Sequence, residues 1–241
     1  MFAGPNGSGK STLKSVLPTE LLGVYLNPDE LEKEIRTTGF LEPAAYRVIT
    51  TADEILNHFR TSSFLQTAGL SGGAAQLRFI EGRLQFGVVE VNAYFASVAA
   101  DFLRRQLLAQ RISFTFETVM SSPDKVRLLE QAQGLGYRTY LYYIATDDPE
   151  INISRVRARV NQGGHDVPED KIVSRYHRSL ELLMAAIRHA DRAYIFDNSS
   201  PATDHTWLAE VTEGRMLELK MDRMPAWFKR AVVDKIGVRL S

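Results

Sequence analysis

The sequence predicts an α/β fold in which a parallel sheet surrounds a phosphate-binding loop, and three observations lead to this prediction. Residues 4–12 read Gly-Pro-Asn-Gly-Ser-Gly-Lys-Ser-Thr and match the pattern G-x-x-x-x-G-K-[ST] at every fixed position. Short apolar runs, typical of buried strands, alternate with amphipathic helical stretches. Several of these runs end in polar or acidic residues, at the edge where open α/β sheets bind their ligands.

The loop supplies the groups that the phosphates of a nucleotide require. Glycines allow the backbone to curl so that successive N–H groups point inward. We expect Lys10 to reach the β- and γ-phosphates and the Ser11 hydroxyl to ligate Mg²⁺. A helix over 11–17, stopped by Pro18, would direct its N-terminus at the phosphates. The alternative is a glycine-rich turn that matches by chance, and the completeness of the match argues against it. The predicted nucleotide-binding residues of the loop are Gly4, Pro5, Asn6, Gly7, Ser8, Gly9, Lys10, Ser11 and Thr12.

The strand that should precede the loop is short. Only Met1, Phe2 and Ala3 are present before Gly4, whereas strands usually have about five or six residues. Either the first strand is very short or the natural chain extends before Met1, and we favour the second interpretation.

The composition excludes several classes of protein. Basic and acidic residues balance at 29 each, so no overall field attracts nucleic acid or anionic lipid. The chain has no cysteine, which excludes disulfides, thiolate metal sites and cysteine nucleophiles. No apolar run approaches the roughly 18 residues of a membrane span, and the N-terminus lacks a signal-peptide pattern. We therefore expect a soluble cytoplasmic protein.

A second strand leads to a candidate acidic residue. The apolar run 24–26 reads as a buried parallel strand that ends near Asn27 and presents Asp29 at the start of a polar helix over 29–36. Because ligands collect at the carboxyl ends of such strands, Asp29 is expected to face the same crevice as Lys10. The alternative is that Asp29 serves only as the N-cap of its helix.

Residues 40–91 do not fit the βα alternation and are interpreted as an insertion on the substrate side. Helical spacing predicts a helix over 51–66 with Thr50 or Thr51 as cap, and the runs 77–80 and 84–88 predict a β-hairpin. A long amphipathic helix over 92–110 then returns to the core.

The tetrapeptide 70–73, Leu-Ser-Gly-Gly, resembles the signature loop of ABC-type ATPases. That family also needs a strand ending in Asp-Glu shortly downstream, which this sequence does not supply. We favour the interpretation that these glycines break the chain between the helix and the hairpin.

Three more strands follow in the second half of the chain. The first ends at Glu117 and Thr118, again at a carboxyl edge, and Asp148 with Pro149 marks a strong helix start. The remaining predicted elements are strands over 112–118 and 137–145, a last strand with its exit loop over 193–199, helices over 124–133 and 225–236, and a hairpin around 213–215.

Two arginine-bearing helices, joined by the glycine loop 163–168, suggest a mobile lid. Arg155 and Arg159 share a face of the first helix, and Arg175 lies on the second, over 169–189. The planar guanidinium suits bidentate binding of phosphate. The alternative is that they are solvated surface arginines. His165 in the loop is interpreted as a hydrogen-bonding loop residue rather than an acid or base.

With these residues in place, the chain resembles the zeta-toxin kinase family, and more closely its stand-alone bacterial members. The resemblance rests on the complete loop, Asp29, the strand end Phe116-Glu117-Thr118 and the arginine-rich helix before Gly163-Gly164-His165. Residues 113–199 carry most of it, and 40–91 do not match. The resemblance implies a P-loop kinase core with a five-stranded parallel sheet flanked by helices, plus an inserted helix and β-hairpin subdomain.

The resemblance also implies roles for single residues. Asp29 would be the general base, with Lys10, Arg159 and Arg175 as the other catalytic groups and Arg155 as a further nucleotide contact. Asn27, Glu117 and Thr118 would bind substrate, and Ser11 would bind the metal.

The resemblance implies a kinase that transfers the γ-phosphate of ATP, with Mg²⁺, to a hydroxyl of a small acceptor. That acceptor would be a nucleotide sugar like UDP-N-acetylglucosamine, or a nucleoside. A protein antitoxin is a further partner to consider. The alternatives are an ABC-type or DNA-repair ATPase without an acceptor, and a polynucleotide kinase, against which the balanced charge counts. We expect a single domain over 1–241, with an insertion at about 40–91 and a C-terminal hairpin and helix over about 205–241.

Overall fold

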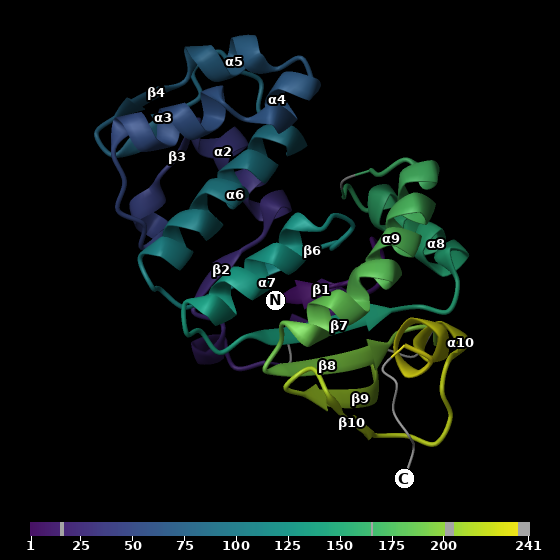
Figure 1. The fold of residues 1–241 in the computed structure, drawn as a ribbon. Coiled ribbons are helices and arrows are strands. Elements are labelled where there is room, and N and C mark those ends of the chain that lie inside the picture. Colours follow the sequence, from purple (N-terminus) through teal and green to yellow (C-terminus); the bar gives the residue numbers. More distant parts are fainter. Residues whose placement is uncertain (15–16, 165, 201–204, 236–241) are drawn as a thin grey trace. The chain divides into compact units, whose positions relative to one another are not determined.

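The computed structural model describes residues 1–14, 17–164, 166–200 and 205–235. The chain divides into two compact units (Figure 1). Unit 1 comprises Met1–Leu17 and Glu117–Ser241, and unit 2 comprises Pro18–Phe116. The expected insertion over 40–91 lies within unit 2.

A mostly parallel sheet has the strand order β10-β9-β8-β7-β1-β6-β2. Its five strands from β8 to β2 are parallel, whereas β9 and β10 are antiparallel. The predicted α/β fold with five parallel strands is therefore confirmed, and the C-terminal hairpin extends that sheet. The strands are β1 (Phe2–Ala3), β2 (Val24–Leu26), β6 (Phe114–Thr118), β7 (Tyr140–Ala145), β8 (Arg192–Asp197), β9 (Thr206–Thr212) and β10 (Met216–Leu219).

Strand β6 contributes to both units. Its first three residues pair with β2 in unit 2, and Glu117 and Thr118 pair with β1 in unit 1. Strand β1 has only two residues, both buried, and pairs with β6 on one side and β7 on the other. This short strand is therefore paired along both of its edges.

In unit 1, helix α9 is the longest element and packs against α7, α8 and the C-terminal π-helix. Helices α8 and α9 pack together around a buried hydrophobic cluster, which consists of Ile153, Val156, Val167 and Ile172. The unit's helices are α1 (Lys10–Lys14), α7 (Asp124–Gly134), α8 (Pro149–Asn161), α9 (Glu169–Arg188) and α10 (Ala226–Phe228), followed by the π-helix Lys229–Val233. The helix starting after Asp148 is confirmed, since the Asp148 side chain accepts from Glu150 N.

Two predicted helices of unit 1 differ in extent. The described part of α1 is Lys10–Lys14, Leu17 is not helical, and residues 15 and 16 of the predicted helix lie outside the described part of the chain. The predicted helix over 225–236 is instead a short α-helix that continues as a π-helix to Val233, and residue 236 again lies outside.

Unit 2 contains the predicted hairpin and a third strand, which together form a small antiparallel sheet in the order β3-β5-β4. Helix α6 packs against α2, α3 and α4. The core of unit 2 includes aromatic side chains, with edge-to-face contacts from Phe86 to Phe59 and Phe95. The elements are α2 (Pro28–Thr38), α3 (Ala52–Arg60), α4 (Ser63–Thr67), α5 (Ser71–Gln76), α6 (Ala93–Ala109), β3 (Phe40–Leu41), β4 (Arg78–Ile80), β5 (Arg83–Gln85) and the 3₁₀ turns Thr19–Leu21 and Pro43–Tyr46.

Two predictions in unit 2 are wrong. The helix predicted over 51–66 is broken at residues 61 and 62, because Ser62 caps a new helix by accepting a hydrogen bond from Leu65 N. The glycines at 72 and 73 do not break the chain but lie inside α5. A Cβ on Gly73 would lie 3.1 Å from the Phe95 ring, which favours glycine here, and the contacts of α5 with α3 and α4 override its weak helix propensity.

Within the described ranges, no helix has the length and apolar character that crossing a membrane requires.

Candidate phosphate-binding site

The loop over residues 4–12 follows β1 directly and has the backbone that only glycine accepts easily. Gly4 N donates to Thr118 O at the end of β6 (3.3 Å). Gly4 and Gly9 have φ values of 147° and 97°. A Cβ on Gly4 would lie 2.0 Å from Ile144 O, and one on Gly9 would lie 2.4 Å from Asn198 Nδ2. Glycine at these positions is therefore required by the backbone angle and by close neighbours together.

Lys10 lies against the loop it closes. Its Nζ donates to Gly4 O at 2.8 Å and to Pro5 O at 2.9 Å. Leu13 N donates to Gly9 O, which starts α1 at the end of the loop. The ammonium group of Lys10 and the N-terminus of α1 thus both lie at this loop. Their positive charge favours binding of an anion there.

Ser11 in the first turn of α1 pairs with Glu117 near the end of β6. Ser11 Oγ donates to Glu117 Oε2 at 3.2 Å, and Glu117 is only 7% exposed. In P-loop proteins a hydroxyl and a nearby carboxylate hold Mg²⁺ together with phosphate oxygens. The described residues contain no cluster of three or more His, Cys, Asp or Glu side chains that could hold a metal alone. The oxygen pair fits Mg²⁺, which commonly uses one or two protein oxygens with water and phosphate.

Asn152 holds the loop from the side of α8. It is fully buried, and its Nδ2 donates to Asn6 O at 2.5 Å. Its Oδ1 accepts from Thr146 Oγ1 at the end of β7, and Tyr176 OH in α9 donates to Thr146 O at 2.6 Å. Burial raises the pKa of Tyr176, which keeps its hydroxyl protonated as a donor.

A second set of contacts comes from the chain after β8. Asn198 Nδ2 donates to Ser8 O at 2.8 Å, and His205 Nε2 lies 3.1 Å from Gly9 O. The sequence analysis missed Asn152, Asn198 and His205. Only Asn198 carried a usable signal, because it directly follows a predicted strand at the ligand-binding edge.

Arg155, predicted to contact the nucleotide, donates to backbone oxygens beside the loop. Its Nη1 bonds Asn198 O at 2.7 Å and its Nη2 bonds Ser200 O at 3.1 Å. Thr118 also supports local backbone, since its Oγ1 accepts from Met120 N at 2.9 Å.

Asn27 and Asp29 lie in unit 2. Asn27 is the N-cap of α2, and its side chain accepts from Asp29 N at 2.9 Å. The alternative that Asp29 caps this helix is therefore wrong, and its exposed carboxylate lies in the first turn. Its role as the base remains a prediction.

The two predicted clamp arginines lie on packed helices of unit 1. Arg159 is exposed in the last turn of α8, where Gly164 folds back so closely that a Cβ would lie 2.6 Å from Arg159 Cγ. Arg175 is half-buried in α9. Their phosphate-binding role remains a prediction. Arg157, in contrast, pairs with Glu169 at the surface, and His165 lies outside the described residues.

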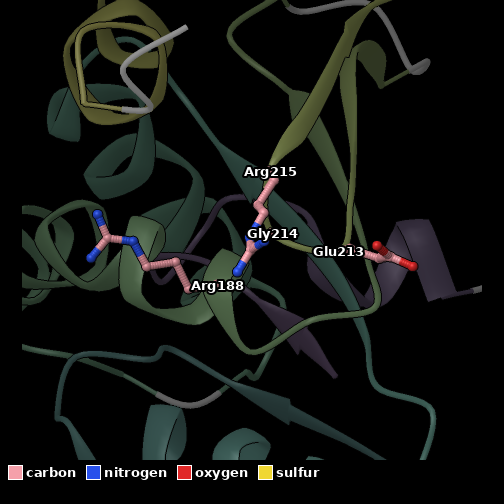
Figure 2. A pocket seen from close by; sticks show the side chains of 4 residues that line it. All are labelled: Arg188, Glu213, Gly214 and Arg215. Carbon is pink, nitrogen blue, oxygen red and sulfur yellow. The ribbon is translucent and has the colours of Figure 1, made fainter.

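A cavity of about 680 Å³ lies elsewhere in unit 1 (Figure 2). It is lined by Arg188 at the end of α9 and by the β9–β10 turn Glu213-Gly214-Arg215, and the Glu213 carboxylate points away from Arg188. The turn follows Thr212, which pairs with Arg192 at the start of β8. The cavity therefore lies at the amino ends of the parallel strands, whereas the loop lies at the carboxyl ends where such sheets bind ligands.

Part of this chain matches the sequence model of a known protein family. Residues 87–206 match the sequence model of the family described as Zeta toxin. This segment belongs to the zeta-toxin family. It includes the loop partners Glu117, Asn152, Asn198 and His205, and also Arg155, Arg159 and Arg175. The loop itself and Asp29 precede the matched segment.

A curated protein resembles part of this chain. An uncharacterized protein of Haemophilus influenzae is 35% identical over 69 residues, which cover 29% of this chain and 49% of that protein. The chain thus spans about half the length of this curated relative.

Two crystal structures share the fold. One is described as the AvrRxo1-ORF1:AvrRxo1-ORF2 complex with sulphate ions (TM-score 0.53, 14% identity), and one as the same complex with ATP (TM-score 0.52, 16% identity). Each alignment covers 91% of this chain and 60% of the other chain. At this identity the likeness concerns the fold alone.

Proposed function

We propose that this protein is an ATP-dependent kinase of the zeta-toxin type, which transfers the γ-phosphate to a hydroxyl of a small acceptor. The observation that carries the proposal is the Ser11–Glu117 hydrogen bond beside a complete phosphate-binding loop. It unites a hydroxyl and a carboxylate for Mg²⁺ with a lysine and glycine loop for phosphate. The ATP in the description of a structure with a similar fold agrees with this assignment.

The residues of unit 1 would bind and orient the nucleotide. Lys10 and the loop N–H groups would hold its phosphates, and Ser11 with Glu117 would hold Mg²⁺. Bound there, the metal would neutralise negative charge on the phosphates. In this proposal Glu117 binds the metal. The prediction from the sequence was that Glu117 binds the acceptor. Phosphoryl transfer has a loose transition state, so positioning and charge neutralisation supply most of the acceleration.

Other residues keep their predicted roles within this proposal. Asp29 would accept the proton of the acceptor hydroxyl, a task that suits a carboxylate engaged in neither capping nor an ion pair among the described residues. Arg159 and Arg175 would bind the transferred phosphoryl group, while Asn27 and Thr118 would line the acceptor site. The acceptor would be a nucleotide sugar like UDP-N-acetylglucosamine, or a nucleoside.

The test is transfer of labelled γ-phosphate from Mg-ATP to a panel of nucleotide sugars, nucleosides and DNA 5′-ends. A labelled small acceptor that disappears with Lys10→Ala and with Asp29→Asn supports the proposal. ATP hydrolysis without any labelled acceptor, unchanged by Asp29→Asn, would contradict it and favour an ATPase. Labelled DNA ends would favour a polynucleotide kinase.

We also propose a protein partner, because the structures with a similar fold are described as two-component complexes. Expression with the neighbouring open reading frames, followed by affinity purification, tests this. A stoichiometric partner that inhibits transfer supports an antitoxin, and full activity without any copurifying chain contradicts it.

A further inference from the structure

We propose that Asn152, Asn198 and His205 form a carbonyl clamp that orients the N–H groups of the phosphate-binding loop, and that the C-terminal helix completes this clamp through Trp227. The proposal rests on the proposed nucleotide site and names the positioning residues that shape it. Of these residues, Trp227 lies beyond the segment that matches the zeta-toxin family.

The three side chains contact the carbonyl groups of residues 6, 8 and 9 of the loop. Asn152 bonds Asn6 O at 2.5 Å, Asn198 bonds Ser8 O at 2.8 Å, and His205 lies 3.1 Å from Gly9 O. Asn152 comes from α8, whereas Asn198 and His205 both follow β8 and lie together beside Gly9, so two separate segments of unit 1 hold the loop.

Peptide geometry converts these contacts into an orientation of the N–H groups. In a planar trans peptide the C=O and the following N–H point in opposite directions, and the described chain has no cis peptide. Holding the carbonyls of residues 6, 8 and 9 outward therefore turns the N–H groups of Gly7, Gly9 and Lys10 to the other side of the loop. Inward-facing N–H groups are what a phosphate requires.

Asn198 is itself fixed from two sides. Arg155 uses both Nη atoms to hold the carbonyls of Asn198 and Ser200. On the other side, Asp197 is 8% exposed and accepts from Ser199 N at 3.0 Å and Ser199 Oγ at 2.7 Å. Trp227, fully buried in α10, donates from Nε1 to Asp197 Oδ1 at 2.8 Å. A buried carboxylate with three donors is a rigid support for its neighbour.

Two roles can be considered for Arg155: it could contact the nucleotide, or it could brace the backbone through the carbonyls of Asn198 and Ser200. A nucleotide contact would depend mainly on its positive charge, which lysine preserves. A brace that spans two carbonyl oxygens depends on the guanidinium fork, which lysine lacks.

The experiment measures binding of Mg-ATP and Mg-ADP by calorimetry, which needs no acceptor, together with KM values and melting temperature. Asn198→Ala should weaken ATP binding about two- to tenfold, the effect of one hydrogen bond. KM for ATP should rise by the same factor, with KM for the acceptor and the melting temperature nearly unchanged. The matched control is Asn161→Ala, at an exposed position on α8, which should change none of these values.

Two further variants test the support of the clamp. Arg155→Lys should weaken ATP binding nearly as much as Arg155→Ala, and Trp227→Phe should weaken it in the same direction. If Asn198→Ala melts far below the wild type, Asn198→Leu, which keeps the volume without a donor, is measured below its melting temperature.

Full ATP affinity in a folded Asn198 variant, alongside loss of binding in Lys10→Ala, would overturn the clamp. ATP affinity that Arg155→Lys preserves and Arg155→Ala loses would overturn the brace and assign Arg155 to the nucleotide. A wild type that binds ATP but phosphorylates no acceptor would refute the proposed kinase and leave the clamp measurable.

Discussion

Ser11 Oγ and Glu117 Oε2 lie 3.2 Å apart, which joins the residue after the loop lysine to the end of β6. The pairing follows from sheet register, because Phe2 in β1 lies opposite Glu117 in β6. The loop that follows β1 therefore lies beside the carboxyl end of β6, where Ser11 of α1 reaches Glu117. Their separation along the chain is 106 residues, so only strand order could reveal this pair.

Glu117→Gln removes the negative charge of this pair and keeps its shape. We expect the Mg²⁺ concentration for half-maximal transfer to rise and the rate to fall about 10²-fold, as for loss of other preorganised charged groups. The measurement is the initial rate at increasing Mg²⁺ and saturating ATP. Glu130→Gln, at an exposed position of α7, is the control. An unchanged Mg²⁺ dependence would remove Glu117 from the proposed metal site.

Gly9→Ala places a side chain at a φ of 97° and against Asn198. We expect a loss of about 1–3 kcal/mol in the free energy of unfolding, the usual cost of such a backbone conformation. Gly134→Ala in α7 meets open space and should instead stabilise the protein by about 0.4–1 kcal/mol. Urea unfolding of both variants tests the contrast. Equal effects of the two substitutions would contradict the loop geometry.

His58 should make the protein less stable as the pH falls below neutrality. Burial lowers the pKa of His58 below its ordinary value of 6.5, and the nearby Arg105 and Arg104 act in the same direction, against Asp101. Since the folded state takes up this proton less readily, the stabilisation is complete above about pH 6.5 and is lost as pH falls toward the folded pKa.

The measurement is the free energy of unfolding between pH 8 and 5 for the wild type and His58→Gln. The difference between the two profiles should shrink as the pH falls. The pKa of Asp101, despite its own burial, is lowered by Arg105 and Arg104, and so its contribution is lost only below about pH 4. A constant difference between the profiles would show that His58 does not titrate in this range.

Thr51 should stabilise the start of α3. Its side chain accepts from Glu54 N, and the Glu54 carboxylate accepts from Thr51 N, which completes a capping box. Thr51→Ala should lower the free energy of unfolding by about 1 kcal/mol. Thr37→Ala is the control, because Thr37 lies inside α2, exposed, with its hydroxyl bonded back to Lys33 O. A loss as large in Thr37→Ala as in Thr51→Ala would argue against the capping box.

Local signals predicted much of this fold. The capping residue Thr51, the helix start at Asp148 and the hairpin over 77–88 depend on neighbouring residues, and all three are present. The glycines of α5 were misjudged because their helix is stabilised by contacts with α3 and α4, which local propensity does not contain.

The sequence by itself determined the phosphate-binding loop, the five parallel strands and the family to which residues 87–206 belong. These follow from short-range chemistry: a loop motif with fixed spacing, and apolar runs of strand length. Only the tertiary structure decided which side chains surround the loop. It brought Glu117 to Ser11, turned Arg155 to the carbonyls of Asn198 and Ser200, and placed Asn198 against Ser8. The physical reason is that strand order, not sequence distance, sets which carboxyl ends are neighbours.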